Sequence, residues 1–265
     1  LRKAGDIFKR DIDFYIDKPV GEGAFSTVYE GRSPDTVVKT FKDFETKQAP
    51  DYLDQVTEMA KQEAYLQQKA ANVGLAPAVT GYGMSPYSTA PVIEMEDMRD
   101  MYRTVNEQYS GRPPREVSVG TQQQVGQLAL QGLALSDRNM GNIMVNRMTG
   151  RPKQIDFGLA KEVAQGSELQ IRSLADATTD GLYRAGLEQE SEIFEGLVNE
   201  YLQQGDLVNA LNMAKQGFSR LQKIKPSAVK AHFAGADPNK VVYPLEGTNT
   251  QNQLMQEMLD AGYLG

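Results

Sequence analysis

Two carboxylates and one amide stand in a single short stretch of the chain, and their types suit the binding of a divalent cation. Asp137 and Asn142 are five residues apart, and Asp156 follows Asn142 by fourteen. Between Asn142 and Asp156 lie Ile143-Met144-Val145, a turn-rich piece that ends in Gly150, and then Gln154-Ile155. This order predicts two short strands joined as a β-hairpin. Because a hairpin returns the chain, we expect Asn142 and Asp156 to lie side by side. Their oxygens would then bind Mg²⁺, with Asp137 nearby as a base.

This stretch resembles the catalytic loop and DFG motif of the protein kinase superfamily. The family pattern is H-R-D-x-x-x-x-N, followed by D-F-G; here Asp137 to Asn142 matches the D-x-x-x-x-N part, and Asp156-Phe157-Gly158 is complete. Leu135 and Ser136 stand where the family has His-Arg. The resemblance implies that Asp137 accepts or orients the proton of a substrate hydroxyl, while Asn142 and Asp156 hold Mg²⁺. A turn with solvated acids is the alternative.

The segment from Val20 to Glu30 resembles the glycine-rich loop of the same family, G-x-G-x-x-G-x-V. Its first two glycines are present, and a serine takes the place of the third. Glycine has no side chain, so backbone N–H groups at such a loop can approach phosphate oxygens. The resemblance implies that this loop binds ATP through Gly21, Glu22, Gly23, Ala24, Phe25, Ser26 and Val28. An ordinary flexible hairpin tip is the alternative.

Lys39 lies on a predicted strand, Thr36 to Phe41. It matches the lysine of the kinase V-A-I-K motif, which implies that it holds the α- and β-phosphates of ATP. The alternative is a strand lysine that faces water.

A helix is predicted from Tyr52 to Ala71, with Asp51 as its N-cap. Glu63 falls on its apolar face, whereas Glu58 falls on a polar face. The other members of the apolar face are Val56, Met59, Ala60, Leu66 and Ala70. A lone carboxylate that faces a core is costly unless it is paired. We therefore expect Glu63 to pair with Lys39, as the corresponding glutamate does in kinases; the alternative places Glu63 at the edge of the face.

The stretch from Ala90 to Met98 resembles the last small-lobe strand and the hinge of kinases. The resemblance implies that Ile93 is the gatekeeper and that the backbone from Glu94 to Glu96 meets the adenine edge. Apolar contacts around the ring are expected from Val20, Val28, Val37 and Met144. A buried strand would carry the same residues.

Beyond these motifs the chain is predicted to be mostly helical. We expect helices over 99–109 and 117–133, two more between Leu187 and Pro226 that break at Gly205-Asp206, and a last one over 254–261. After Lys161 the resemblance to kinases fades, because the A-P-E motif and every tryptophan are absent. The fold expected is α+β, a two-lobed protein-kinase-like fold with a small antiparallel sheet lobe over 1–98 and an atypical helical lobe over 99–265.

Composition narrows the classes of function. The 265 residues include 28 basic and 35 acidic side chains, a formal charge of −7, and no basic run that would favour a nucleic-acid partner. Without cysteine there are no disulfides, and a single histidine argues against a zinc site or a Ser-His-Asp triad. No apolar run has membrane-spanning length, so we expect a soluble, intracellular protein. The start at Leu1 indicates an excised domain.

The resemblance as a whole implies an ATP- and Mg²⁺-dependent protein kinase that acts on Ser/Thr hydroxyls. Asn139 stands where serine/threonine kinases commonly have lysine. That cation is then expected from elsewhere, for example from Arg138 or Lys161; low activity is the alternative. Ser136 replaces an arginine that often pairs with a phosphorylated loop, so we expect activity that needs no loop phosphorylation. These losses resemble the reduced effector kinases that pathogenic bacteria deliver into host cells. That resemblance implies secretion into the host cytoplasm and a host protein as substrate.

Two other functions fit the same motifs. Asp137-Arg138 with Asn142 and the DFG motif also resembles phosphoinositide kinases and small-molecule phosphotransferases, although the glycine-rich loop favours protein kinases. A pseudokinase that binds nucleotide without catalysis is the second alternative, for which Asn139 is the argument.

Overall fold

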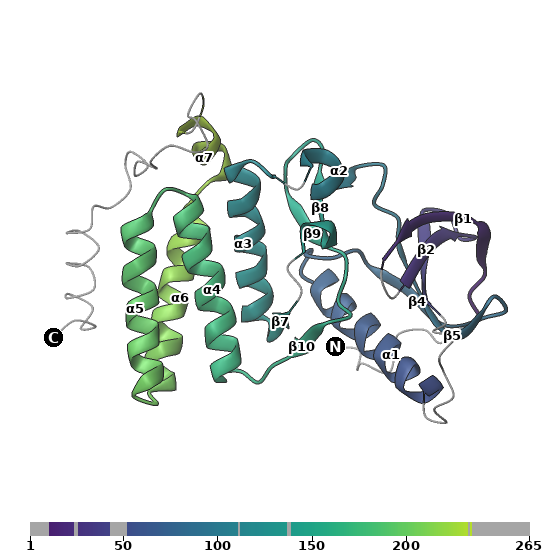
Figure 1. The fold of residues 1–265 in the computed structure, drawn as a ribbon, viewed down its shortest axis with the longest axis horizontal. Coiled ribbons are helices and arrows are strands. Elements are labelled where there is room, and N and C mark those ends of the chain that lie inside the picture. Colours follow the sequence, from purple (N-terminus) through teal and green to yellow (C-terminus); the bar gives the residue numbers. More distant parts are fainter. Residues whose placement is uncertain are drawn as a thin grey trace. The chain divides into compact units, whose positions relative to one another are not determined.

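The computed structural model describes residues 11–23, 26–42, 52–110, 112–136, 139–232 and 234, and its elements fall into two compact units (Figure 1). The first unit comprises Leu1–Thr104, Ser136–Thr149 and Lys153–Lys161. The second comprises Val105–Leu135, Gly150–Pro152 and Glu162–Gly265. The predicted α+β architecture is confirmed, with an antiparallel sheet in one unit and a mostly helical second unit.

The first unit is built on a five-stranded antiparallel sheet in the order β1-β2-β3-β5-β4. Its strands are β1 (Phe14–Glu22), β2 (Ser26–Gly31), β3 (Thr36–Phe41), β4 (Val79–Ser85) and β5 (Ser88–Glu96). β3 is central, and five of its six residues are buried. The buried, β-branched Val37 and Val38 suit a strand covered on both faces. Lys39 follows them and is paired with Val28 of β2 and Ile93 of β5.

Helix α1 (Tyr52–Ala71) packs against β4 and β5. Its predicted apolar face is buried at Val56, Ala60, Leu66 and Ala70, and Glu63 is buried among them. Met59 is a correction, because its side chain is 54% exposed. The buried face continues through Ala64 and Gln67, so it is centred on the side of the helix away from Met59.

A second, three-stranded sheet has the order β6-β8-β9, and its residues except Pro152 belong to the first unit. Its strands are β6 (Tyr102–Thr104), β8 (Ile143–Asn146) and β9 (Pro152–Gln154). The predicted hairpin is thereby confirmed: Asn146 Oδ1 accepts the N–H groups of Met148 and Thr149 in its turn, and Gly150 follows at φ +70°. The helix predicted over 99–109 is wrong in its first half, because Tyr102–Thr104 pairs with β8 and only α2 (Val105–Tyr109) is helical.

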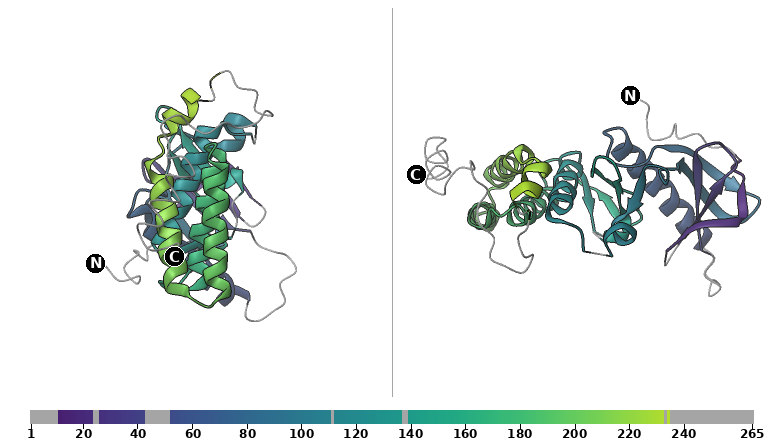
Figure 2. Two further views of the ribbon diagram at one scale, coloured as in Figure 1. Left: turned by 90° about the vertical axis from the view of Figure 1, so that its left-hand side faces the viewer. Right: turned by 90° about the horizontal axis from the view of Figure 1, so that it is seen from above.

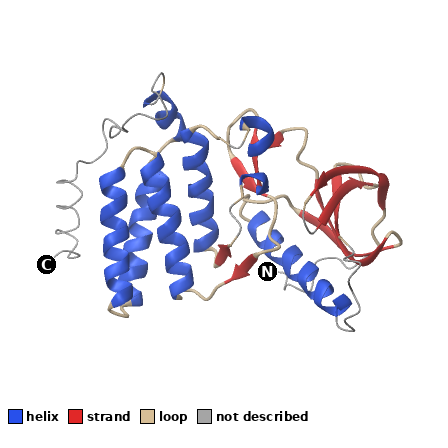
Figure 3. Cartoon of the chain, viewed as in Figure 1, coloured by secondary structure: helices blue, strands red, loops and turns tan. Residues whose placement is uncertain are grey.

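The second unit is dominated by helices that run side by side (Figures 1 and 2) and is mostly blue in Figure 3. They are α3 (Arg115–Leu130), α4 (Glu168–Arg184), α5 (Glu188–Gln203), α6 (Leu207–Lys223) and α7 (Pro226–His232). The short strand β7 (Leu133–Leu135) also belongs to the second unit. The 3-10 helix η2 (Met140–Asn142) belongs to the first unit, and the strand β10 (Ala160–Glu162) contains the point at which the chain passes to the second. α5 and α6 match the predicted pair, with Asp206 capping α6. The helix expected over 254–261 lies outside the described residues.

Across the described ranges, no helix combines the length and the apolarity that a bilayer crossing demands.

Close helix packing makes Gly126 of α3 intolerant of a side chain. An ideal Cβ there would lie 2.1 Å from Cε2 of Phe218, a fully buried ring on α6. We expect Gly126→Ala to lower the free energy of unfolding by about 1–3 kcal/mol, because the ring must move within a packed core. The matched control is Gly196→Ala in α5, where a Cβ would meet nothing within 4 Å. It should raise stability by about 0.5–1 kcal/mol through helix propensity. Urea unfolding of both variants is the measurement, and equal stabilities would contradict the packing argument.

Candidate active site

Lys39 is the centre of a buried cluster of charges in the first unit. Its Nζ lies 2.5 Å from Glu63 Oε1 and 3.1 Å from Asp156 Oδ1. Lys39 and Glu63 are 6% and 2% exposed. β3, α1 and the turn after β9 each supply one of the three groups, so residues far apart in sequence converge on one ammonium. The polar-face residue Glu58 is exposed, in agreement with the choice of Glu63 as the partner.

The three charges shift one another's protonation. Burial alone would lower the pKa of Lys39, but the carboxylates of Glu63 and Asp156 outweigh burial and raise it. Burial is the largest influence on Glu63 and raises its pKa, with the charge of Lys39 acting in the opposite direction. For Asp156, burial is opposed by Lys39 and by the Gly158 N–H, which together hold the pKa below its ordinary value. The arrangement therefore favours a protonated Lys39 and an ionised Asp156 at neutral pH.

Asp156 is fixed by its neighbours yet remains accessible. Its Oδ1 accepts the Gly158 N–H at 3.0 Å, and the side chain of Phe157 is buried. A Cβ on Gly158 would come within 3.4 Å of both Asp156 Oδ1 and Glu63 Oε2, so the close approach suits glycine. The Asp156 side chain is still 40% exposed, whereas Glu63 is not. Asp156 can thus reach a ligand, while Glu63 is enclosed against Lys39.

Asn142 ends η2 directly before β8 and lies next to the Asp156 segment. Its carbonyl accepts the Ile155 N–H at 2.9 Å, and its own N–H donates to the Asn139 carbonyl. An amide and a carboxylate are oxygen donors of the kind that Mg²⁺ takes, one or two of them sufficing when phosphates supply the rest. Within the described residues no three His, Asp or Glu side chains form a ready-made metal cluster. Asp137 and Arg138 lie outside the described residues.

The glycine-rich segment is the hairpin between β1 and β2. Gly21 pairs with Val28 and Glu22 with Thr27, and the Gly23 N–H donates to the Ser26 carbonyl at 2.8 Å. A Cβ at either glycine would meet no atom closer than 3.7 Å, so the glycine positions are open to an approaching group. The Glu22 carboxylate is paired with Lys42 at 2.7 Å on the surface. Ala24 and Phe25 lie outside the described residues.

The role of Glu94 in nucleotide binding stays a prediction, and the structure places this residue inside the sheet. Its backbone is paired with Val38 on one side and with Gly81 on the other. Its side-chain oxygens accept the hydroxyls of Ser33 at 3.0 Å and Thr80 at 2.8 Å. Because β5 continues to Glu96, Ile93 and Glu94 lie within the sheet rather than at its exit. Glu96 also lies within β5, where it is paired with Thr36 and its N–H donates to the Ala78 carbonyl.

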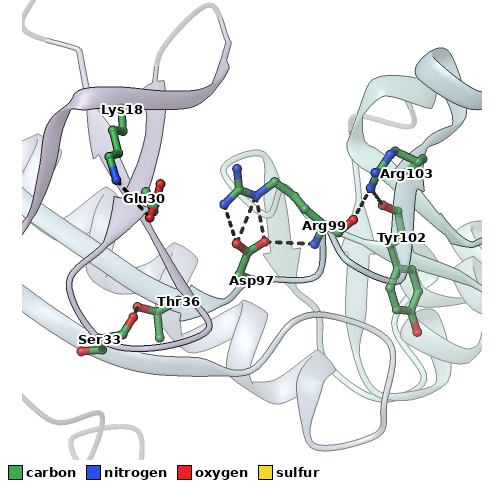
Figure 4. Close-up of polar contacts among 8 residues, drawn as sticks. All are labelled: Lys18, Glu30, Ser33, Thr36, Asp97, Arg99, Tyr102 and Arg103. Atoms are coloured by element: carbon green, nitrogen blue, oxygen red, sulfur yellow. Dashed lines mark hydrogen bonds and ion pairs between the residues drawn. The ribbon is translucent and has the colours of Figure 1, made fainter.

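The connection after Glu96 is held by two arginines that sequence analysis does not single out (Figure 4). Asp97 accepts hydrogen bonds from the backbone N–H and the guanidinium of Arg99, which lower its pKa. The Arg103 guanidinium donates to the carbonyls of Arg99 and Tyr102. The D-x-R spacing within MEDMRD is the only sequence signal for the first pair. These bonds make a defined link between β5 and β6.

Three of the four residues that were predicted to contact the adenine ring lie close together, and the contact with the ring stays a prediction. Val20, Val28 and Val37 belong to one cluster with the buried Ile93 and Met95. Met144 of β8 is also buried, at 8% exposure.

Gln154 is a further residue that sequence analysis does not identify. It is 2% exposed, and its Nε2 donates to the Asp156 carbonyl at 3.0 Å. The one signal in the sequence is the position of this glutamine in a predicted strand, directly before Ile155-Asp156.

Comparison with known proteins finds no matching protein-family model and no matching curated protein. Among solved structures, the chain is similar to the bifunctional kinase-methyltransferase WbdD at 18% identity and a TM-score of 0.46, covering 73% of this chain and 42% of that one. A co-crystal structure of WbdD with a kinase inhibitor is similar at 17% sequence identity and a TM-score of 0.46, and the match covers 75% of this chain and 44% of that one. A high-resolution crystal structure of WbdD is similar at 16% sequence identity and a TM-score of 0.47, and the match covers 74% of this chain and 44% of that one. The chain thus spans less than half the length of these structures.

Proposed function

We propose that the chain is an ATP- and Mg²⁺-dependent phosphotransferase, and more narrowly a protein kinase that acts on Ser/Thr hydroxyls. The observation that carries the proposal is the joining of Lys39 to both Glu63 and Asp156. A buried lysine with two carboxylates, one hidden and one accessible, is suited to hold phosphate oxygens beside a metal ion. Phosphoryl transfer depends mainly on such positioning and charge stabilisation.

Each residue has a distinct part in this proposal. Lys39 binds phosphate oxygens, and Glu63 keeps its ammonium aimed. Asp156 and Asn142 would hold Mg²⁺, which when bound offsets the negative charge of the transferring phosphoryl group. Asp137, for which the argument is sequence spacing alone, would orient the substrate hydroxyl.

The narrower choice of a protein substrate rests on the glycine-rich hairpin, which resembles that of protein kinases. Nine residues, Leu159 to Ser167, separate the DFG motif from α4. Together with Ser136 in place of arginine, so short a segment supports activity that does not depend on loop phosphorylation. The resemblance to reduced bacterial effectors extends the proposal to a host protein.

The test is incubation of the chain with Mg²⁺ and γ-labelled ATP in separate mixtures with a generic protein, host lysate, lipid vesicles and a panel of small hydroxyl compounds. Label on serine or threonine of protein supports the proposal. Label in lipid or in a small molecule would assign the site to the other phosphotransferase classes. Nucleotide binding without transfer in any mixture would indicate a pseudokinase.

A further inference from the structure

We infer that Gln154 is a positioning residue that closes a ring of contacts around Lys39, and the inference rests on the function proposed above. The side-chain amide of Gln154 is buried and donates to the backbone carbonyl of Asp156, two residues away. Burial of a side-chain amide lowers the stability of the fold unless the amide makes hydrogen bonds. Here the bond fixes the backbone of the residue whose carboxylate meets Lys39.

The other end of Gln154 is tied to α1. Its backbone N–H donates to the Leu75 carbonyl at 3.0 Å, and the Leu75 N–H donates to the Ala70 carbonyl at the end of α1. Two neighbouring glutamines of that helix hold the same connection. Gln67 Nε2 donates to the Pro77 carbonyl at 3.1 Å, and Gln68 Oε1 accepts the Val79 N–H at 2.9 Å.

These contacts form a closed circuit. From Gln154 it runs through Asp156 to Lys39, from Lys39 to Glu63 on α1, and along α1 through Leu75 back to Gln154. A displacement of α1 that broke the Lys39–Glu63 pair would therefore also strain the Leu75–Gln154 bond. Gln154 thus links Asp156, the accessible carboxylate proposed to bind Mg²⁺, to the helix that supplies Glu63. This link needs no phosphorylation.

The test compares Gln154→Met and Gln154→Glu, which keep the length of the side chain but remove the N–H donor. The control is Gln123→Met, which removes a glutamine that donates to the Leu221 and Ile224 carbonyls in the second unit. Residues next to a metal ligand typically change metal affinity or activity by 10–100-fold when altered. We expect both Gln154 variants to raise the Mg²⁺ concentration for half-maximal transfer at least about tenfold, with a smaller change in kcat at saturating Mg²⁺. Gln123→Met should leave that concentration unchanged.

Hydrogen exchange supplies a readout that does not depend on transfer. Both Gln154 variants should speed exchange of the amides at 156–158 and 63–68, while Gln123→Met should not. Wild-type exchange at those amides, or equal acceleration in the control, would overturn the inference whatever the enzyme activity. Absence of transfer in the wild-type chain would count against the proposed function alone.

Discussion

Asp156→Asn should reduce the rate of phosphoryl transfer by about 100- to 1,000-fold at saturating ATP. The amide keeps the size of the side chain and an oxygen for the Gly158 N–H, but it removes the negative charge. That charge lies 3.1 Å from Lys39 and is the only carboxylate of the cluster with an exposed side chain. Its loss therefore weakens Mg²⁺ binding directly. Lys39 retains Glu63, so the change in unfolding free energy should stay within about 1–2 kcal/mol.

The measurement is the initial rate of labelled phosphate transfer as a function of Mg²⁺ concentration. The control is Asp54→Asn, which neutralises an exposed acid in the first turn of α1 and should leave the rate unchanged. Binding of ADP without Mg²⁺ should be similar in both variants. A wild-type rate with wild-type Mg²⁺ dependence in Asp156→Asn would remove the metal role assigned to this residue.

The site was more predictable from the sequence than the second unit. Glu63 could be placed opposite Lys39 because a carboxylate on an apolar helical face has few ways to be satisfied. The approach of Asn142 to the Asp156 segment followed from two predicted short strands on either side of a turn-rich piece. Each of these inferences used local pattern together with one strong physical constraint.

Helix α4 was not predicted, and its composition explains why. Its buried residues include the polar Gln170, Ser173 and Thr178 and the small Ala177 and Gly181, so the apolar stripe is broken. Its buried Gln170 depends in part on a tertiary partner, since its Nε2 donates to the Ala129 carbonyl of α3 as well as to Gln165 Oε1. Gly181 is buried against Leu221 of α6, where a Cβ would come within 2.5 Å. Such a helix is specified by its neighbours, which periodicity cannot reveal.

The position of Glu94 inside β5 likewise depends on partners that the sequence does not show. The run Val92-Ile93-Glu94-Met95-Glu96 alternates toward its end in a way that suits either a strand or an exit from the sheet. What keeps Glu94 inside is the pair of hydroxyls from Ser33 and Thr80, which come from other parts of the chain. Those partners satisfy a buried carboxylate that the sequence alone would place in solvent.

Lys39→Met should be the most destabilising single change at the site, lowering the free energy of unfolding by about 3–5 kcal/mol. The substitution leaves Glu63 at 2% exposure without a cation and facing Asp156, whose charge raises the pKa of Glu63. The double variant Lys39→Met/Glu63→Leu should recover most of the lost stability. Replacement of a whole buried ion pair by apolar side chains is often neutral or stabilising. Transfer should be lost in both variants, because neither can hold phosphate oxygens.

The free energy of unfolding that is lost in Lys39→Met should grow as pH rises. Ordinary acid denaturation runs the other way, with stability lost as pH falls. In the wild type, burial already raises the pKa of Glu63 in the folded state above its ordinary 4.5, against the opposing charge of Lys39. Removal of Lys39 takes away that opposing charge, so the pKa of Glu63 should rise further. A raised folded pKa means that the favourable protonated state is fully present below about 4.5, and that stability falls as pH rises through the higher value. In the wild type, Asp156 has a lowered pKa, so its contribution is present above 3.8 and is lost as pH falls below that value. The Glu63 effect therefore makes the gap between wild type and variant grow as pH rises above about 4.5, whereas the Asp156 effect changes only at lower pH.

Urea unfolding at about pH 5 and about pH 8 measures this gap. The control is Lys61→Met on the same helix, which removes a lysine paired with Glu58 at 3.4 Å where both side chains are more than half exposed. An exposed pair of this kind is worth well under about 1 kcal/mol, so its loss should be small at both pH values. A gap for Lys39→Met that matched the control, or that narrowed as pH rose, would mean that Glu63 is not held as an ion by Lys39. Only a buried, mutually dependent pair produces a large loss, recovery in the double variant and this sign of pH dependence together.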